Sequence, residues 1–345
     1  MKNIKVNLII IAALFIAFMV IVFLTEGTEE LMNILGRMKS TYIFMSFLCT
    51  VLFWMGEALI IHSTMRCIQK EYKWSKSVRI SMIGRFFESV TPFGSGGQAA
   101  MGYAMIKEGV KPGYAVLILV MKSISFQFVI LLYSTLAIFY KGGFLIGAIP
   151  HLVLLFSIGV LANSLVLLFY TMFFLKKKTA AKIIFTTVDL LKKIKIIKRP
   201  FKQKKMLIRE LDLFKDGADM IRRNPFLLIK TFIYQFLRLT VFYSIPFFIL
   251  LAIDNTATGI MTIISSQAVL GIITSYIPLP GAAGGTEGIG YLFFRLFFRE
   301  RTVLSVILLW RIITFYSKIF FGGIYTLLAR EKPLKKESVL QDSKI

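Results

Sequence analysis

Two breaks rich in glycine and proline interrupt long apolar stretches of this 345-residue chain. The first break reads TPFGSGGQ over residues 91–98, and the second reads PLPGAAGGTEG over residues 278–288. A helix needs about 20 apolar residues to cross a bilayer, and the stretches beside each break are shorter than that. Paired interrupted segments in the two halves of a membrane protein indicate a transporter binding site. The breaks therefore predict a binding site within a membrane protein.

The composition is typical of a polytopic membrane protein, because 57% of the residues are hydrophobic. The first apolar run, residues 8–24, follows Lys2 and Lys5 and has no small-x-small cleavage site after it. We therefore expect a retained anchor and not a cleaved signal peptide. Cys49 and Cys67 are the two cysteines, too few for a metal cluster or a disulfide framework. We expect no metal and no cofactor.

The formal net charge of +24 would indicate a nucleic-acid partner in a soluble protein. Here the charge is concentrated in alternate loops. Residues 176–223 hold 16 basic and 5 acidic residues, and residues 63–79 carry a net charge of +4. This alternation follows the positive-inside rule. We expect the basic loops to lie in the cytoplasm against anionic lipid headgroups. Because no aromatic stacking motif accompanies the charges, we expect no nucleic-acid partner.

The apolar segments and basic loops together predict six spanning helices and two re-entrant helical hairpins in the cell membrane, with both termini in the cytoplasm. The hairpins cover residues 80–106 and 259–298 and enter from opposite sides. The alternative is eight full spans with glycine-broken helices. The six expected spans are 8–24, 41–62, 114–140, 152–175, 226–253 and 303–328.

The order of span, hairpin and span occurs twice, over residues 41–140 and 226–328, in opposite orientations. Such an inverted repeat is common among alternating-access carriers. We therefore predict an all-α fold with one integral membrane domain over residues 1–330. This domain includes a basic cytoplasmic segment, residues 176–225, in which we expect amphipathic helices on the membrane surface. A short polar tail, residues 331–345, follows the domain.

Irregular backbone inside a membrane must be buried in protein or line a wet cavity. At each break we expect proline to stop the incoming helix and a half-helix to begin, after Gly97 in the first break and after Gly285 in the second. Gln98 and Thr286 would then lie in the first turns, and threonine is a favoured N-cap. The free N–H groups and positive dipole end of such a helix suit a phosphate. Alternatively, the glycines only permit tight helix crossing.

Nine ionisable residues lie within the apolar segments, six of them basic and three acidic. Each costs at least ~2.5 kcal/mol at a lipid-facing helix centre, so each should face a partner or a cavity. The positive surplus suits an anionic headgroup, and arginine suits bidentate contact with phosphate. Two alternatives are that Arg85 and Glu88 only pair with each other and that Arg295 snorkels to an interface. The nine are Glu57, Arg85, Glu88, Lys122, Arg238, Glu287, Arg295, Arg311 and Lys318.

The predicted site combines the two breaks with charged residues of the flanking helices. Glu88 or Glu287 is a candidate carrier of a coupling proton. The chain has no Walker motif, no zinc-protease motif and no recognisable catalytic triad, so we expect no catalytic residues. The predicted substrate-binding residues are Arg85, Glu88, Pro92, Gly94, Gly96, Gly97, Gln98, Arg238, Pro280, Gly281, Gly284, Gly285, Thr286, Glu287, Arg311 and Lys318.

Residues 85–98, residues 278–288 and the later Leu309-Trp310-Arg311 resemble the signature stretches of the lysylphosphatidylglycerol synthase transmembrane (flippase) family. The resemblance covers nearly the whole chain. It implies a membrane domain that moves aminoacylated or other anionic phospholipids between leaflets. Better-known members fuse this domain to a C-terminal domain that transfers an amino acid from aminoacyl-tRNA to phosphatidylglycerol. Only a short polar tail follows Arg330 here, so we do not expect the transferase activity.

We therefore expect a lipid translocase for an anionic or aminoacylated phospholipid. The alternatives are a phosphatidylglycerol lysyltransferase, a carrier of a small anion or of a polyprenyl-phosphate lipid, and a scaffold for a separate synthase. The expected partners are membrane phospholipid and the anionic headgroups at the basic face. A separate synthase and a second copy of the chain are further candidates.

Overall fold

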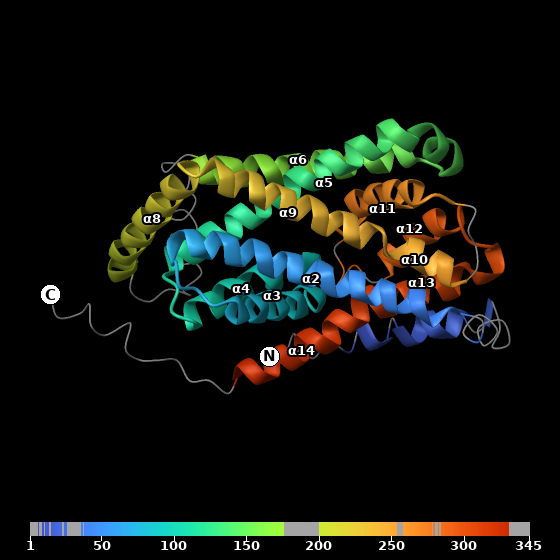
Figure 1. Ribbon diagram of the computed structural model, residues 1–345, viewed down its shortest axis with the longest axis horizontal. Helices are drawn as coiled ribbons and strands as arrows, with labels where there is room; N and C mark the ends of the chain where they lie inside the picture. The colour runs from blue at the N-terminus through green and yellow to red at the C-terminus, as the bar shows by residue number, and fades with distance from the viewer. Residues whose placement is uncertain are drawn as a thin grey trace.

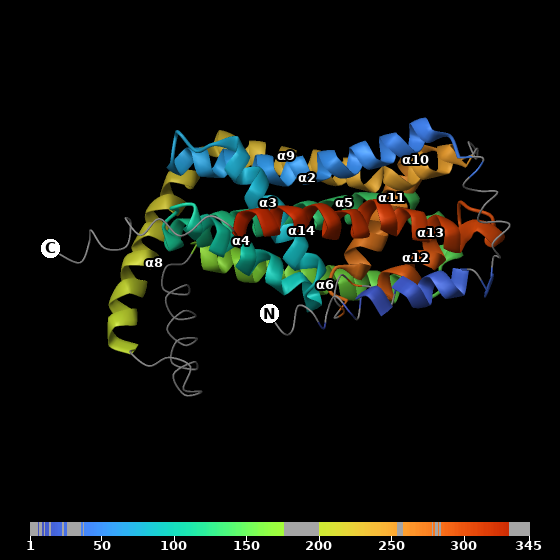
Figure 2. The same ribbon diagram turned by 90° about the horizontal axis from the view of Figure 1, so that it is seen from below.

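Every regular element that the computed structural model describes is a helix, and no strand occurs among the described residues. The predicted all-α polytopic membrane fold is therefore confirmed. The helices form an elongated bundle, and most of them run close to its long axis (Figure 1, Figure 2). The described residues are 38–175, 200–253, 258–277, 279, 282 and 284–330, together with scattered residues between 6 and 36.

Five helical segments in this part of the chain are long and apolar enough to cross a membrane. They correspond to five of the six predicted spans. The sixth, residues 8–24, lies partly outside the described residues, and those of its residues that are described are helical. The five segments are α2 (Ser40–Ile68), α5 (Pro112–Ala148), α6 (Leu152–Leu175), α9 with α10 (Pro225–Tyr243 and Ile245–Ala252), and α13 with α14 (Val303–Arg311 and Ser317–Arg330).

Local sequence explains where several helices begin and bend. Pro112 and Pro225 stand in the first turns of α5 and α9, where proline removes no helix hydrogen bond. Asn224 caps α9, and its Oδ1 accepts a hydrogen bond from the backbone N–H of Leu227 at 3.0 Å. A π-helical turn over Ile312–Tyr316 joins α13 to α14. Such turns are rare and often occur at functional sites.

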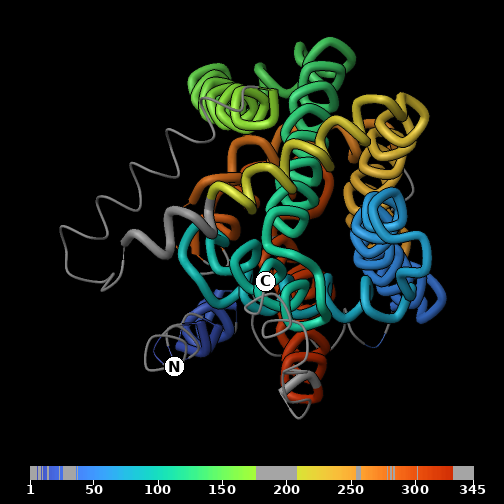
Figure 3. Tube along the Cα trace, turned by 90° about the vertical axis from the view of Figure 1, so that its left-hand side faces the viewer, coloured from blue at the N-terminus to red at the C-terminus, as the bar shows by residue number. Residues whose placement is uncertain are grey.

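The core lies where the long helices meet. α2 packs along α9, and α5 packs along both α6 and α11 (Ile260–Thr274). Figure 3, which looks along the long axis, shows the first of these pairs on one side of the bundle. Buried side chains such as Leu239, Ile249, Phe293 and Ile307 belong to the largest apolar cluster. Because lipid is as apolar as these side chains, close packing and not transfer from water stabilises such a bundle in a membrane.

The first break joins two short helices that pack against each other. α3 (Trp74–Ser89) leads into a 3-10 turn, η1 (Pro92–Gly94), and α4 (Ser95–Lys107) returns along α3. Pro92 follows the end of α3, as predicted. With 16 and 13 residues, the two helices are each shorter than the roughly 20 residues that a span requires.

Ion pairs hold the start of α3 to the end of α4, away from the first break. Glu108, which directly follows α4, pairs with Lys76 Nζ at 3.1 Å and with Arg79 Nη1 at 2.6 Å, near the start of α3. Burial alone would raise the pKa of Glu108, but the two cations outweigh burial and hold this pKa below its usual range. The carboxylate therefore stays charged at neutral pH and keeps the two helix ends together.

The second break joins α11 to α12 (Gly285–Phe294), which ends short of the predicted residue 298. In both views α3 and α4 occupy the left half of the bundle, and α11 and α12 occupy the right half (Figure 1, Figure 2). The two helix pairs thus approach the middle from opposite ends. An inverted repeat of residues 41–140 and 226–328 would give this arrangement. Entry of the pairs from opposite sides of a bilayer stays a prediction.

α8 (Pro200–Arg222) crosses the left end of the bundle at an angle (Figure 1). Leu211, Phe214, Ala218 and Ile221 form its buried face, at the spacing of an amphipathic helix. Glu210 Oε2 accepts a hydrogen bond from the backbone N–H of Gly113 at 2.7 Å, which fixes α8 to the start of α5. The predicted basic segment thus contains an amphipathic helix, and its place on the membrane surface stays a prediction. Its residues 176–199 lie outside the described residues.

A substitution at Gly322 of α14 tests how closely α14 packs against α3. A β-carbon here would lie 2.9 Å from Met82 O and 3.1 Å from the backbone nitrogen of Phe86. Gly322→Ala should therefore force the helices apart and lower the free energy of unfolding by about 1–3 kcal/mol. Gly323→Ala is the matched control, since its β-carbon would approach the Phe86 ring no closer than 3.6 Å. Thermal unfolding in detergent should show a lower Tm for the first variant only, and equal Tm values would contradict the packing.

Candidate functional site

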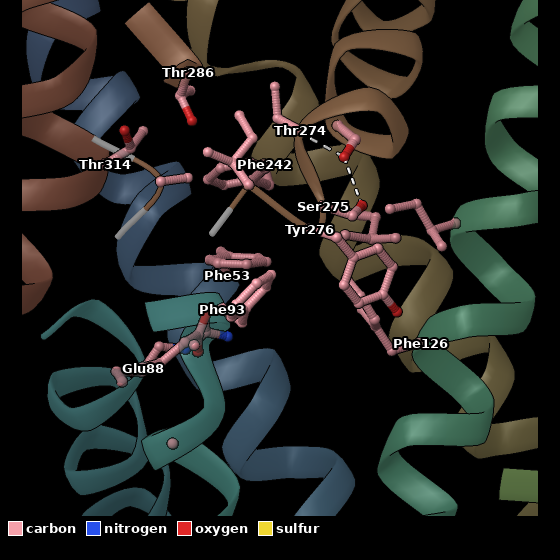
Figure 4. Close-up of a pocket in the computed structure, with 18 of the residues that line it drawn as sticks. Phe53, Glu88, Phe93, Phe126, Phe242, Thr274, Ser275, Tyr276, Thr286 and Thr314 are labelled. Carbon is pink, nitrogen blue, oxygen red and sulfur yellow. Dashed lines mark hydrogen bonds and ion pairs between the residues drawn. The ribbon is translucent and has the colours of Figure 1, made fainter. Parts of the chain in front are cut away.

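A cavity of about 620 Å³ lies between the two breaks. Phe93 and Gln98 line it from the first break, and Ala282 and Thr286 line it from the second. In Figure 4 the side chains of Phe93 and Thr286 lie on opposite sides of the Phe242 ring. The volume falls within the range of about 300–1,000 Å³ that is usual for small-molecule sites. Two turns almost 200 residues apart in the sequence, at residues 91–98 and 278–288, thus share one cavity.

The first break turns through left-handed backbone. Phe93 has φ = 55° and Gly94 has φ = 63°. Glycine adopts this region without steric cost, whereas a phenylalanine there stores strain. Thr91 braces the turn, because its Oγ1 accepts a hydrogen bond from the Gly96 N–H at 2.9 Å and donates one to Phe87 O at 2.7 Å. The surrounding structure therefore stabilises Phe93 in a left-handed backbone conformation that is unfavourable for this residue.

Two helix starts differ from prediction. α4 begins at Ser95 and not after Gly97, because the Thr91 hydroxyl already satisfies an N–H group of its first turn. In the second break the cap of α12 is Gly284, which has φ = 80°, so Thr286 is the second helical residue and not the N-cap. The chain turns through positive φ at this cap, and glycine adopts that conformation far more readily than threonine.

Glu57 of α2 holds together polar side chains of three other helices, which we call the Glu57 cluster. Its carboxylate pairs with Arg85 Nε of α3 at 2.7 Å, Lys122 Nζ of α5 at 2.5 Å and Arg238 Nη2 of α9 at 3.7 Å. It also accepts a hydrogen bond from Ser81 Oγ at 3.0 Å. Only 1% of Glu57 is exposed. A lone charge buried this deeply would be very costly, so the cations stabilise Glu57 and each other's positions.

The ring of Phe53 orients two of these cations. The guanidinium carbons of Arg85 and Arg238 lie 4.4 Å and 4.3 Å from the ring centroid, within the range of cation–π attraction. Arg238 Nε also donates to Phe53 O at 3.1 Å, and its Nη1 donates to Gln235 Oε1 at 3.0 Å. Both guanidinium groups are therefore held in place at the cavity wall.

A second charged group, the Phe315 cluster, lies at the other half of the cavity lining. The ring of Phe315 is 4.1 Å from Arg311 Cζ and 5.2 Å from Lys318 Nζ. Arg311 Nε pairs with Glu287 Oε1 of α12 at 2.7 Å. Phe315 itself belongs to the π-helical turn Ile312–Tyr316. This turn brings Arg311 and Lys318, which are seven positions apart, onto the same ring.

Amide and hydroxyl groups complete the lining. Gln98 Nε2 donates to Ser123 Oγ at 3.0 Å, which links α4 to α5. Gln127 Nε2 donates to the hydroxyl of Tyr276 at 2.6 Å. Tyr276 lies two residues before the second break, so this bond ties the approach to that break to α5. Among the described residues no group of three or more His, Cys, Asp and Glu side chains is placed to hold a metal ion.

The described lining has a surplus of three positive charges. It includes five cations and two carboxylates. Charges in such a confined, partly apolar space are costly unless a counter-ion compensates them. The lining therefore favours an anionic ligand. The cations are Arg85, Lys122, Arg238, Arg311 and Lys318, and the carboxylates are Glu57 and Glu88.

The structure brings most of the predicted binding residues together. Those that line the cavity are Arg85, Glu88, Gly94, Gly97, Gln98, Arg238, Thr286, Arg311 and Lys318. Those that the structure places next to the lining but not in it are Pro92, Gly96, Gly284, Gly285 and Glu287. Pro280 and Gly281 lie outside the described residues.

Several lining residues were missing from the predicted site. Glu57 and Lys122 stood out as charges within apolar segments, but nothing local indicated that they face the breaks. Phe53 and Phe315 gave no signal at all, because phenylalanine is common in every span. The alternative pairing of Arg85 with Glu88 accounts for a small part of the geometry, since that contact is 3.8 Å and the contact of Arg85 with Glu57 is 2.7 Å.

Comparison with known proteins gives the same family as the sequence motifs. The model of the lysylphosphatidylglycerol synthase TM region matches residues 8–322, which include both breaks and both charged clusters. The chain belongs to this family. It is also 25% identical to a UPF0104 membrane protein of Archaeoglobus fulgidus over 323 residues, covering 90% of this chain and 93% of the relative. The family match, residues 8–322, contains all the residues that line the cavity.

Glu57→Gln tests whether the Glu57 cluster supports the fold. Three cations, of which Arg85 and Arg238 are buried, would lose their counter-charge. Breaking a buried ionic group typically costs about 3–5 kcal/mol. Glu71→Gln is the matched control, because Glu71 is exposed and surface substitutions usually change stability by less than about 0.5 kcal/mol. Thermal unfolding in detergent should give a clearly lower Tm for Glu57→Gln alone. A Tm equal to that of the control would mean that the cluster does not stabilise the protein.

Proposed function

We propose that this protein moves an anionic or aminoacylated phospholipid between the leaflets of a cell membrane. The observation that carries the proposal is the cavity that both breaks share, with five cations in its lining. In many carriers the substrate binds where interrupted helices of two inverted repeats meet. Membership of a family named for a lipid-modifying membrane protein supports lipid as the cargo.

The lining offers contacts for both parts of a phospholipid. The guanidinium groups of Arg85, Arg238 and Arg311 suit bidentate contact with a phosphate. Phe93 and Leu279, one from each break, line the same cavity and are 59% and 41% exposed. These apolar side chains would contact the acyl chains while the headgroup lies among the cations.

Transport requires the cavity to open to each leaflet in turn. The two helix pairs approach the middle of the bundle from opposite ends (Figure 2), and residues of both breaks line the cavity. Rocking of one half against the other would expose the cavity alternately. Within the Glu57 cluster, Arg238 belongs to the second half, and its contact with Glu57, at 3.7 Å, is the longest of the three ion pairs. We expect this contact, and the bond between Gln127 and Tyr276, to change as the halves move.

The proposed orientation places both termini in the cytoplasm. The basic segment 176–225 would then lie against the anionic headgroups of the inner leaflet, where each well-placed Lys or Arg contributes about 1 kcal/mol. The angled course of α8 at one end of the bundle supports this placement (Figure 1).

Arg311→Gln tests the proposed site in transport. In proteoliposomes with fluorescent phosphatidylglycerol, wild-type protein should make inner-leaflet lipid accessible to an external quencher. Loss of a charge-assisted contact should slow this exchange by about tenfold or more. Arg295→Gln is the matched control, because Arg295 is exposed at the end of α12 and does not line the cavity. It should exchange lipid at the wild-type rate.

Three outcomes would count against this proposal. Exchange no faster than in protein-free liposomes would reject lipid transport. Equal slowing by both substitutions would reject the cavity as the route. Formation of aminoacylated lipid from charged tRNA by the purified protein would instead favour the transferase reading.

A further inference from the structure

The positive charges around the cavity outnumber the negative charges of the described acidic residues. The lining holds five cations with Glu57 and Glu88, and Glu287, which is not part of the lining, pairs with Arg311 at 2.7 Å. With all three acids counted, the described residues retain two positive charges. The Glu57 cluster alone combines three cations with one carboxylate. Because uncompensated charge in a confined site is costly, a ligand that brings two negative charges would be favoured over one that brings a single charge.

Hydrogen-bond donors at the wall point to the same kind of ligand. Arg85 Nη2 and Trp310 Nε1 are buried and have no hydrogen-bond partner among the described residues. Both residues line the cavity, and each of these groups can only donate. When their side chains turn toward the cavity, these donors would gain hydrogen bonds from a ligand that is rich in acceptor oxygens. A terminal phosphate offers three strong acceptor oxygens and carries about −1.5 to −2 charges at neutral pH.

We propose that the cavity selects a terminal phosphate, a phosphomonoester headgroup, over the phosphodiester headgroup of an ordinary phospholipid. This inference rests on the proposed function, since it specifies the cargo of the same cavity. An aminoacylated headgroup fits least well, because its ammonium group would meet the positive surplus of Arg85, Lys122 and Arg238. The described lining has two carboxylates to offset this surplus. Glu57 already pairs with three cations, and Glu88 lies near Phe93 (Figure 4).

Binding measurements on the full-length protein in detergent test this selection. The probes are short-chain phosphatidic acid as the monoester, short-chain phosphatidylglycerol as the diester, a polyprenyl phosphate, and inorganic phosphate. At pH 7.5 the monoester lipid should bind at least about tenfold more tightly than the diester lipid, since it gains a charge and an acceptor for charge-assisted bonds.

The pH dependence separates the ligand's charge from the protein's. The second ionisation of a phosphomonoester lies near pH 6, so the preference should fall towards one as the pH is lowered to 5. The diester keeps the same charge over this interval and reports any titration of the facing protein groups. The groups in the lining are Arg85, Lys122, Arg238, Arg311, Lys318, Glu57, Glu88, Tyr170, Tyr243 and Tyr276, and Glu287 pairs with Arg311 beside it.

Lys318 offers a substitution that leaves the Glu57 cluster intact. Lys318→Gln removes one cation of the surplus and should reduce the monoester preference at pH 7.5 at least threefold. Lys318→Arg retains the charge and should keep the preference. Matching thermal unfolding curves for the two variants would show that the difference does not come from misfolding.

The results distinguish this inference from the proposed function. Equal affinity for the two lipids at pH 7.5, or a preference that persists unchanged at pH 5, would overturn the inference. Transport of phosphatidylglycerol in proteoliposomes would then still support the proposed function. Selective monoester binding without transport of any lipid would support the inference and reject the function. Among the monoesters, the tightest binder would identify the source as a glycerolipid, a polyprenyl lipid or the free anion.

Discussion

The ionic contacts of Glu57 join four helices at the wall of the cavity. One buried carboxylate draws Arg85, Lys122 and Arg238 from three helices to the same point. Without it, the three cations would repel one another in a space where water screens them poorly. With it, they stay close together at the wall and retain a net positive charge. The cluster therefore joins the helices and, through the same interactions, presents positive charge to the anionic headgroup that we propose.

The other half of the lining also holds an arginine between a carboxylate and an aromatic ring. There Arg311 is held by one carboxylate, Glu287, and by the ring of Phe315. In the first half Arg85 is held by Glu57 and by the ring of Phe53. In each case a carboxylate and an aromatic face fix an arginine before any ligand arrives. A headgroup that binds between them would meet donors already in position, which lowers the entropy cost of binding.

Much of the fold could be predicted because its signals are local. Hydropathy located five spans that the structure describes, and the glycine and proline content located both breaks. The cross-helix contacts could not be predicted in this way. Arg238 bonds to the carbonyl of Phe53 across 185 residues of sequence, and no short pattern encodes such a pairing. The predicted cap of α12 was wrong for a related reason. The path of the turn, and not the capping preference of threonine, placed Gly284 at the N-cap position.

The most direct test is an experimental structure of the protein in nanodiscs that contain anionic phospholipid. Our account predicts that both breaks lie near the middle of the bilayer, at residues 91–98 and 278–288. It also predicts headgroup density within contact distance of Arg85 and Arg311. Breaks that face water on opposite membrane surfaces, with the space between them closed and free of lipid, would contradict the account.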